Sequence, residues 1–554
     1  MKKPPQSRYA RQRLAAARSP GGSDTPPACH SLPPGRFATH CFATGEPRPP
    51  QSLRDSSPIG KPTGEPRLVL LLLLGCVLRL WALGCVPAGL NQDEASALYD
   101  GWAILHSGMD RNGYVFPVLL RAWGSGQNAL YSYLAIPFLA LFGLNSAAGR
   151  LPMALFGCVS LYLACDLCRR LRGESCEAWV LLALAVNPWH TLLSRWALES
   201  NLLPGMLLLG TWFLSRVREK ETWLLPAAAT YALSLYAYGT AYFFLILFLP
   251  LASLWLWKNK AVTLRTYLTA LAVFVLIAFP VSLCQLRNVL GWEAGKFLGL
   301  SLPALSEGRQ SATSILGGGS YAENMKKLLR LLWTQNDGLL WNYAGDFGLL
   351  YGKVGLLLSL FGLGVALREK KEPVLLLWLL GALLACGCVD VNINRVNMLF
   401  LPLVYFQGVG LWKLSTWLRK PALPALPLLL AALLFARFYF TDYAAQMAPV
   451  FYDGLCEAIQ DAEERESGTI FCSYDVNMPY IFVLFATEMP VEQYRESVEF
   501  MNPGAAFEWV CAVDGWHFGY APDEPCAIVR YDKVPEAYRI EARYGEWCVC
   551  MTDE

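Results

Sequence analysis

The sequence predicts an α-helical polytopic membrane protein with about eleven transmembrane helices and a small C-terminal α/β or α+β domain. Of its 554 residues, 55% are hydrophobic and only 16% are charged, whereas soluble domains carry about 25% charged residues. Apolar runs long enough to cross a bilayer recur between residues 67 and 440. The net charge of +2 gives no indication of nucleic-acid binding.

The segment 1–66 precedes the first apolar run and differs from the rest in composition. It holds ten Lys/Arg and four Asp/Glu, with many Pro, Ser and Gly and no helical or strand period. We expect a disordered basic cytoplasmic tail. No apolar core lies within the first thirty residues, so the segment does not read as a signal peptide. A wrongly set start codon is the alternative.

Short basic loops decide which apolar runs cross the membrane. Twelve runs lie at about 67–86, 129–144, 151–168, 176–193, 200–215, 222–238, 240–257, 263–284, 349–367, 373–390, 396–412 and 421–440. Five loops between them each carry three or more Lys/Arg, at 169–172, 216–220, 258–265, 368–371 and 413–420. The positive-inside rule places these loops and the basic tail in the cytoplasm.

The charge pattern holds only if the run 129–144 does not span. It is short and contains Pro137, so we interpret it as a re-entrant or interfacial helix. Eleven spans then remain. The amino terminus is cytoplasmic, and the loops 87–150 and 285–348 face the outer side, as does the C-terminal segment 441–554.

The segment 441–554 changes character and predicts a separate extracytoplasmic domain beside the membrane domain 67–440. Thr469–Tyr474 and Cys526–Tyr531 read as strands, and Tyr452–Glu466 as a helix. Six cysteines, at 456, 472, 511, 526, 548 and 550, could pair in an oxidising compartment, in a connectivity that the sequence does not give.

With this topology, the notable polar residues gather on the outer side. They are Asp93 and Glu94 seven residues beyond the first run, Arg150 at the second span, His190, Arg195 and Glu199 in one short loop, and Arg395 in the corner DVNINR. Carboxylates and arginines beside a bilayer suit a lipid-phosphate substrate. Arginine binds phosphate, and a carboxylate can take a proton from a hydroxyl.

Each of these residues also has an ordinary structural interpretation. The acid pair Asp93-Glu94 could be solvated loop, Arg150 an interfacial anchor and Glu199 a helix cap. His190 could belong to an aromatic interfacial belt, and Arg395 could extend its side chain to the interface. Their common location favours a site over these separate interpretations.

Four stretches carry a family resemblance over about residues 67–440. They read LRLWALGCVPAGLNQDEASALYDGWAILHSG, LALFGLNSAAGRLPMALFG, NPWHTLLSRWALESN and NINRVNMLFLPLVYF. In order and spacing they resemble polyprenol-phosphate-dependent glycosyltransferases of the GT-C fold (glycosyltransferase family 39), in particular protein O-mannosyltransferases and aminoarabinose transferases. The loop 285–348 lacks MIR-like repeats, which speaks against the eukaryotic mannosyltransferase form.

The resemblance implies a role for each matching residue. It makes Asp93 the catalytic base, Glu94 its partner in shaping the acceptor or metal environment, and Glu199 the second acid of the outer loops. Arg150 would hold the lipid phosphate, with Arg395 as a second ligand. Arg195 and His190 would belong to the substrate-binding side. Divalent-metal dependence stays open.

The resemblance also implies the reaction. A sugar would move, with inversion, from a polyprenyl-phosphate carrier to a hydroxyl of a protein or cell-envelope acceptor, at the outer face of a bacterial plasma membrane. Two other classes remain, a flippase for lipid-linked sugars and a non-catalytic membrane scaffold. A flippase would more often place charges in the middle of several spans, and here the span interiors carry almost no acids.

Overall fold

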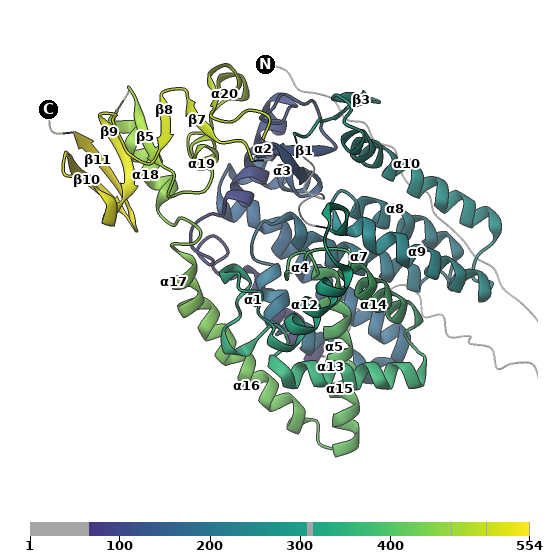
Figure 1. Cartoon of the computed structure of the whole chain (residues 1–554). Helices are drawn as coiled ribbons and strands as arrows, with labels where there is room; N and C mark the ends of the chain where they lie inside the picture. The colour runs from purple at the N-terminus through teal and green to yellow at the C-terminus, as the bar shows by residue number, and fades with distance from the viewer. Residues whose placement is uncertain (1–65, 307–313, 467, 506, 553–554) are drawn as a thin grey trace, which may run out of the picture. The chain divides into compact units, whose positions relative to one another are not determined.

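Each of the eleven expected spans coincides with a helix of the structure, a computed structural model that describes residues 66–306, 314–466, 468–505 and 507–552 (Figure 1). The basic segment expected at 1–66 lies outside these residues except for Pro66. The eleven helices are α1 (Pro66–Leu80), α4 (Ser146–Arg172), α5 (Glu174–Ala185), α7 (Glu199–Ser215), α8 (Leu224–Ser234), α9 (Thr240–Lys258), α10 (Leu264–Val289), α13 (Gly352–Glu369), α14 (Pro373–Cys386), α15 (Phe400–Leu418) and α16 (Ala422–Phe438).

The helices differ in length from the apolar runs that predict them. Within the described residues, six helical segments are long and apolar enough to cross a membrane. The remaining expected spans form shorter helices, such as α5 and α14. In the run 176–193, α5 stops at Ala185 and α6 (Pro188–Leu193) starts at a proline. Proline disfavours helical backbone in the residue before it, so one apolar run becomes two helices.

The five basic loops meet at one end of the helical bundle. Arg172 pairs with Glu369 and Glu372, which joins the loop after α4 to the loop after α13. Three further contacts complete the group: Lys413 with Glu369, Arg170 with Glu219, and Arg218 with Asn259. Two expected spans separate each consecutive pair of these loops, as the charge pattern requires. We call this end the basic end.

The opposite end carries α2 (Gln92–Ser107), the hairpin of β1 (Leu119–Ala122) and β2 (Ser125–Asn128), and α3 (Leu130–Phe142). Helix α3 is the run 129–144. It begins next to Asn128, whose N–H donates to Glu199 at the start of α7, and it ends just before α4 begins. Both of its ends therefore lie at the same end of the bundle, as expected for a helix that does not span.

The long loop between α10 and α13 is largely structured. It contains β3 (Gly295–Phe297), β4 (Leu300–Leu302), α12 (Tyr321–Thr334) and short 3-10 turns at Ile315–Gly317, Leu340–Asn342 and Gly345–Phe347. Further 3-10 turns lie at Glu221–Trp223 and Asn397–Leu399.

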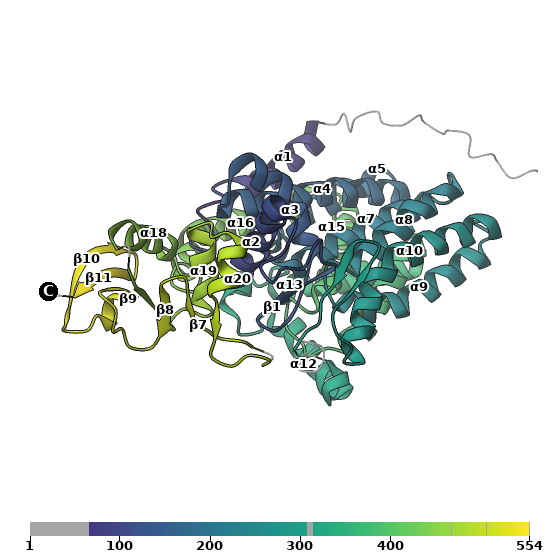
Figure 2. The same cartoon turned by 90° about the horizontal axis from the view of Figure 1, so that it is seen from above.

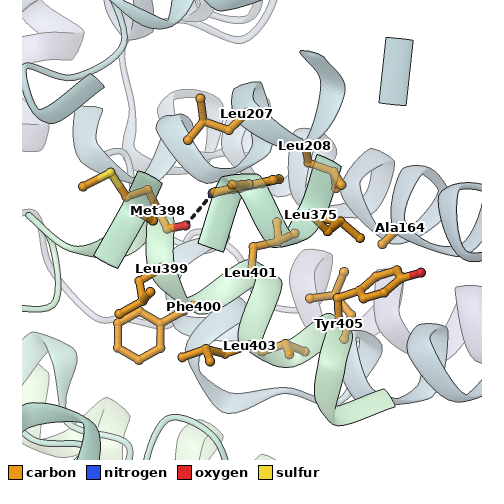
Figure 3. Packing of buried hydrophobic residues seen from close by; sticks show 14 of the residues in the cluster. Ala164, Leu207, Leu208, Leu375, Met398, Leu399, Phe400, Leu401, Leu403 and Tyr405 are labelled. Carbon is orange, nitrogen blue, oxygen red and sulfur yellow. Dashed lines mark hydrogen bonds between the residues drawn. The ribbon is translucent and has the colours of Figure 1, made fainter. Parts of the chain in front are cut away.

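The bundle core is built around α15 and the turn that precedes it. Figure 3 shows Met398, Phe400 and Tyr405 packed near Leu207, Leu208 and Leu375 of neighbouring helices. The Trp378 indole donates a hydrogen bond to the Met398 carbonyl. A Cβ at Gly362 on α13 would lie 1.8 Å from the Phe406 carbonyl oxygen. The backbones of α13 and α15 are thus in direct contact, which only glycine allows here.

The C-terminal part combines helices with a mixed sheet, shown in yellow-green to yellow in Figure 2. Helix α16 continues through a π-helical turn (Tyr439–Tyr443) into α17 (Ala444–Met447). The remaining elements are α18 (Leu455–Arg465), β5 (Ile470–Ser473), α19 (Pro479–Ala486), α20 (Val491–Ser497), β6 (Glu499–Phe500), β7 (Val510–Val513), β8 (Trp516–Gly519), β9 (Cys526–Arg530), a 3-10 turn (Tyr531–Lys533), β10 (Tyr538–Tyr544) and β11 (Trp547–Thr552).

The seven strands follow the order β10-β11-β9-β5-β8-β7-β6, with β5 parallel to both of its neighbours. The predicted helix 452–466 and the two predicted strands are α18, β5 and β9. All six cysteines of this part are free thiols in the structure.

Candidate active site

The acid pair lies at the start of α2. Asn91 caps the helix, and its side chain accepts a hydrogen bond from the Asp93 N–H at 2.9 Å. The Asp93 side chain is partly exposed, and no described residue donates a hydrogen bond to its carboxylate. Asp93 thus presents an unengaged carboxylate from a fixed backbone.

Glu94 is fully buried and fully engaged. Its two oxygens accept hydrogen bonds from Arg150 Nε at 2.9 Å and Arg150 Nη2 at 2.8 Å. The Ala197 N–H donates to one oxygen at 2.6 Å, and the Asn91 N–H to the other at 3.2 Å. Glu94 therefore ties α2 to α4 and to the loop before α7, and leaves Asp93 as the accessible acid of the pair.

Arg150 and Arg195 are both buried among backbone carbonyls. Arg150 donates to the carbonyls of Pro87 and Gly89 as well as to Glu94. Arg195 donates to the carbonyls of Leu78, Trp81 and Val86, which follow α1 or lie at its end, and to the Tyr439 hydroxyl. In these positions both guanidinium groups fix the segment between α1 and α2.

His190 is also buried. Its Nδ1 lies 2.6 Å from Nη2 and 3.2 Å from Nε of Arg79, so it accepts from the guanidinium as a neutral ring. The remaining donors of Arg79 reach carbonyls at Gly75, Leu184 and Ala185. This contact joins α1 to α5 and α6.

Glu199 joins the acid pair through the hairpin. Its carboxylate accepts from the N–H of Asn128, the last residue of β2. The neighbouring Gln127 donates from Nε2 to the Asp93 carbonyl at 3.1 Å and accepts from Ser96. Asp93, Glu94, Arg150 and Glu199 therefore belong to one hydrogen-bonded unit.

Arg395 lies apart from this unit, in the corner after α14. It donates to the Asp390 carboxylate at 2.8 Å, and Lys327 of α12 donates to the same carboxylate at 2.7 Å. The hydrogen bond and charge of Lys327, together with Arg395, hold the pKa of Asp390 below its usual range. Both cations are partly exposed, with Lys327 at 57% and Arg395 at 23%.

Sequence reasoning missed a second acidic cluster beside α2. Asp100, Asp110 and Arg111 are buried, with Arg111 Nη2 3.5 Å from Asp100 and 2.6 Å from Ser96 Oγ. One oxygen of each aspartate has no hydrogen-bond partner. Burial raises the pKa of Asp110 to about 8, and the nearby charge of Asp100 adds to the shift. The polar run DRNGY at 110–114 was the available signal.

The C-terminal elements contact the loops that carry these residues. The Tyr99 hydroxyl donates to the Met489 carbonyl at 2.6 Å, and Arg121 of the hairpin pairs with Glu508. The N–H of Leu90, which lies between Gly89 and the α2 cap residue Asn91, donates to the Phe451 carbonyl at 2.6 Å. The sheet domain thereby holds both α2 and the hairpin in place.

The described residues contain no group of three or more His, Cys, Asp or Glu side chains arranged to hold a metal ion. Both oxygens of Glu94 already accept hydrogen bonds, so this residue is not an available metal ligand as placed here.

Comparison with solved structures identifies the fold. The chain is similar to ArnT from Cupriavidus metallidurans in the apo state, with a TM-score of 0.54 and 14% identity over 87% of this chain and 97% of that chain. For ArnT bound to undecaprenyl phosphate the TM-score is 0.52, with the same identity and coverage. A weaker likeness, at a TM-score of 0.43, is to the oligosaccharyltransferase of Archaeoglobus fulgidus, with 14% identity over 77% of this chain and 62% of that chain.

No protein-family model and no curated protein sequence matches the chain. The likeness to ArnT confirms the predicted fold class, a GT-C-like polytopic membrane protein with a small C-terminal sheet domain.

Proposed function

We propose that this protein is a membrane glycosyltransferase that moves a sugar from a polyprenyl-phosphate carrier to an acceptor hydroxyl, with Asp93 as the general base. The observation that carries the proposal is the unengaged carboxylate of Asp93, held on a buried ion-paired frame in a protein with the fold of ArnT. ArnT has been crystallised with undecaprenyl phosphate, which is a lipid phosphate of the proposed class.

The proposed reaction is a single displacement. The acceptor O–H gives its proton to the Asp93 carboxylate while its oxygen attacks the anomeric carbon of the donor sugar. The bond from that carbon to the phosphate oxygen breaks, and the lipid phosphate leaves with the bonding electrons. Attack opposite the leaving group inverts the anomeric centre.

The buried residues act on this step by fixing positions. Glu94 and Arg150 hold the first turn of α2 against α4, and Gln127 holds the Asp93 carbonyl. Glu199 anchors the hairpin end that carries Gln127. Small displacements of a catalytic group have large rate costs, so a base on a helix start with this support is well suited to its task.

Cations at the same end are available for the phosphate. Arg395 and Lys327 are partly exposed and share Asp390, so either can turn to a phosphate oxygen at the expense of one exposed ion pair. We assign the direct contact with the lipid phosphate to Arg395 and Lys327. Arg150, Arg195 and His190 have buried partners and serve this site by positioning the segment before α2.

The positive-inside rule gives the proposed orientation. With the basic end in the cytoplasm, Asp93 lies at the extracytoplasmic face of the membrane, together with the C-terminal domain. The acceptor would then be a protein or cell-envelope hydroxyl, and the lipid carrier would present its sugar on that side.

Reconstitution tests the proposal against the two other classes. The purified protein in proteoliposomes is given polyprenyl-phosphate-linked sugars and a hydroxyl acceptor. Appearance of glycosylated acceptor and free polyprenyl phosphate supports transfer. Movement of the intact lipid-linked sugar between leaflets without transfer would instead identify a flippase, and neither reaction would identify a binding protein.

A further inference from the structure

A deep apolar cleft lies between α8, α9 and α10, far from the proposed active site. These three helices lie side by side in both whole-chain views (Figures 1 and 2). The cleft has a cavity volume of about 370 Å³. Its lining includes Leu214, Tyr231, Ser253, Leu256, Tyr267 and Phe274.

The cleft belongs to the basic end of the bundle. Leu214 lies at the end of α7, fifteen residues after Glu199, which is about 22 Å along a helix that rises 1.5 Å per residue. Leu256 lies two residues before Lys258, and Tyr267 two residues after Arg265. The proposed active site at Asp93 and this cleft thus lie at opposite ends of the helical bundle.

The lining of the cleft favours a hydrocarbon ligand. Of its side chains, nearly all are aliphatic or aromatic. The Tyr267 hydroxyl donates a hydrogen bond to Ser253 Oγ at 3.2 Å, so two of the polar groups in the lining are paired with each other. A sugar or a nucleotide would lose hydrogen bonds to water here and gain few in return, so a polar ligand is disfavoured.

The rim of the cleft is cationic. The loops that border it carry five exposed cations, Arg218, Lys220, Lys258, Lys260 and Arg265. None of them pairs with a carboxylate among the described residues. Of the two acids nearby, Glu219 pairs with Arg170, whereas Glu221 accepts hydrogen bonds from the uncharged Thr263 and is the one of the two left to offset these five cations. The rim therefore carries an excess of positive charge beside an apolar cavity.

We propose that this cleft binds one anionic glycerophospholipid of the surrounding membrane, with acyl chain in the cleft and phosphate at the rim. Clusters of Lys and Arg beside a membrane attract anionic headgroups. The flexible aliphatic stems of Lys and Arg side chains lie along apolar surface while their charged ends reach the level of the lipid headgroups. The site is separate from that of the glycosyl donor, and the proposal does not depend on the proposed function.

Photolabelling of the full-length protein in nanodiscs tests the site. Photoactivatable phosphatidylglycerol, with the reactive group on its acyl chain, is compared with the matching phosphatidylcholine, and labelled peptides are mapped. We expect phosphatidylglycerol to label peptides of α8, α9 and α10, and to exceed phosphatidylcholine by about ten-fold, because several rim charges act together. Equal labelling by the two lipids, or labelling spread over all lipid-facing helices, would overturn the proposal.

Variants separate the cleft from the rim. Ala270→Phe fills the cleft from α10 and should remove the labelling, whereas Leu433→Phe, on an exposed face of α16, should leave it unchanged. The triple change Lys258→Gln, Lys260→Gln and Arg265→Gln alters only exposed side chains and should bring phosphatidylglycerol labelling down to the level of phosphatidylcholine. Retention of the preference in the triple variant would contradict the proposal even if Ala270→Phe failed to fold.

Competition identifies the source of the hydrocarbon. Unlabelled phosphatidylglycerol should displace the label. Displacement by undecaprenyl phosphate and not by phosphatidylglycerol would assign the cleft to the tail of the donor, and would refute a separate phospholipid site.

Discussion

Arg150 and Glu94 form a buried two-point ion pair that joins α4 to α2. Arg150 Nε and Nη2 reach the two carboxylate oxygens at 2.9 and 2.8 Å, and neither side chain has exposed surface. The same guanidinium binds two carbonyls of the segment that enters α2. The position of Asp93, the residue before Glu94, is therefore set by a charge pair that no ligand needs to complete.

The first prediction concerns the stability of this pair. Arg150→Met leaves the buried carboxylate of Glu94 without its counter-charge, and we expect a loss of about 3–5 kcal/mol of unfolding free energy. Glu94→Gln should cost a similar amount, because it leaves the guanidinium uncompensated. Thermal unfolding of the purified protein in detergent measures both.

The double variant Glu94→Gln/Arg150→Met is the control for this ion pair. It removes both charges, so it should be more stable than the sum of the single changes indicates. Lys326→Gln breaks a pair with Glu323 that is largely exposed and should cost less than about 1 kcal/mol. Full additivity of the two buried changes would show that the pair contributes no coupling.

The second prediction tests the base. Asp93→Asn removes the proton acceptor and keeps the size of the side chain. No described residue donates a hydrogen bond to the Asp93 carboxylate, so the change breaks no such bond. We expect transfer to fall by about 10²–10⁴-fold, the usual contribution of general acid–base catalysis, with unchanged thermal stability. Asp346→Asn, at another exposed acid, is the matched control and should retain activity. Turnover by Asp93→Asn at the wild-type rate would refute the assignment.

The third prediction concerns the phosphate contact. Arg395→Gln and Lys327→Gln each remove a cation that shares Asp390, and both side chains are partly exposed. We expect a higher KM for the lipid-linked donor with little change in thermal stability. KM is measured with the acceptor at saturation. Arg330→Gln, on the same helix as Lys327, is the control. An unchanged donor KM in both variants would exclude these residues as phosphate ligands.

The helices could be predicted from the sequence because their signals are local. Apolar runs and basic loops gave eleven spans, and each is a helix in the structure. Pro137 does not interrupt α3, and prolines also lie inside α4 and α10, so the argument that α3 does not span rests on the charge pattern of the loops and on its length. The break between α5 and α6 at Asn187-Pro188 falls inside the apolar run 176–193, because hydropathy alone does not register a helix end.

The sequence could bring the candidate residues to one side of the membrane but could not give their contacts. Asp93, Glu94, Arg150 and Glu199 lie in one hydrogen-bonded unit, and Arg150 and Arg195 each also bind several backbone carbonyls, which residue identities do not reveal. A buried structural arginine and a phosphate-binding arginine look alike in a sequence. The Asp100–Arg111 pair was missed for a similar reason, since its burial depends on elements far away in the chain.

The fourth prediction concerns the close contact of α2 with α4. A Cβ at Gly149 would lie 2.1 Å from Leu98 Cδ1, and Leu98 is fully buried and cannot move aside freely. We expect Gly149→Ala to cost about 1–3 kcal/mol, as overpacking usually does, and to lower transfer by shifting Asp93. Gly364→Ala, where a Cβ would meet nothing within 4 Å, should be neutral or stabilising.

A second-site change checks the cause of this effect. Leu98→Ala makes room for the added methyl group, so the double variant Gly149→Ala/Leu98→Ala should be more stable than the sum of its two single changes indicates. If the two changes were additive, the loss in Gly149→Ala would not come from this contact.

The last prediction follows from the buried carboxyl of Asp110. Its pKa is raised to about 8 by burial and by the charge of Asp100, although the N–H groups of Asn112 and Tyr114 act in the opposite direction. An aspartate in the unfolded chain has a pKa of about 3.9. Between these values the folded protein holds a proton that the unfolded chain has lost, so this group lowers the unfolding free energy progressively as the pH rises from about 4 to about 8.

Asp110→Asn should remove this pH dependence. The amide keeps the oxygen that accepts from Asn112 and Tyr114, and it carries no charge at any pH. At pH 5 the variant and the wild type should melt at similar temperatures. At pH 9 the variant should have the higher melting temperature, because its unfolding free energy should exceed that of the wild type by an amount on the order of a few kcal/mol. Apart from Asp100, which interacts with Asp110, the titrating groups are the same in both proteins and are expected to cancel in the difference. A difference in melting temperature that stays constant between pH 5 and pH 9 would mean that Asp110 does not hold a proton in the folded protein.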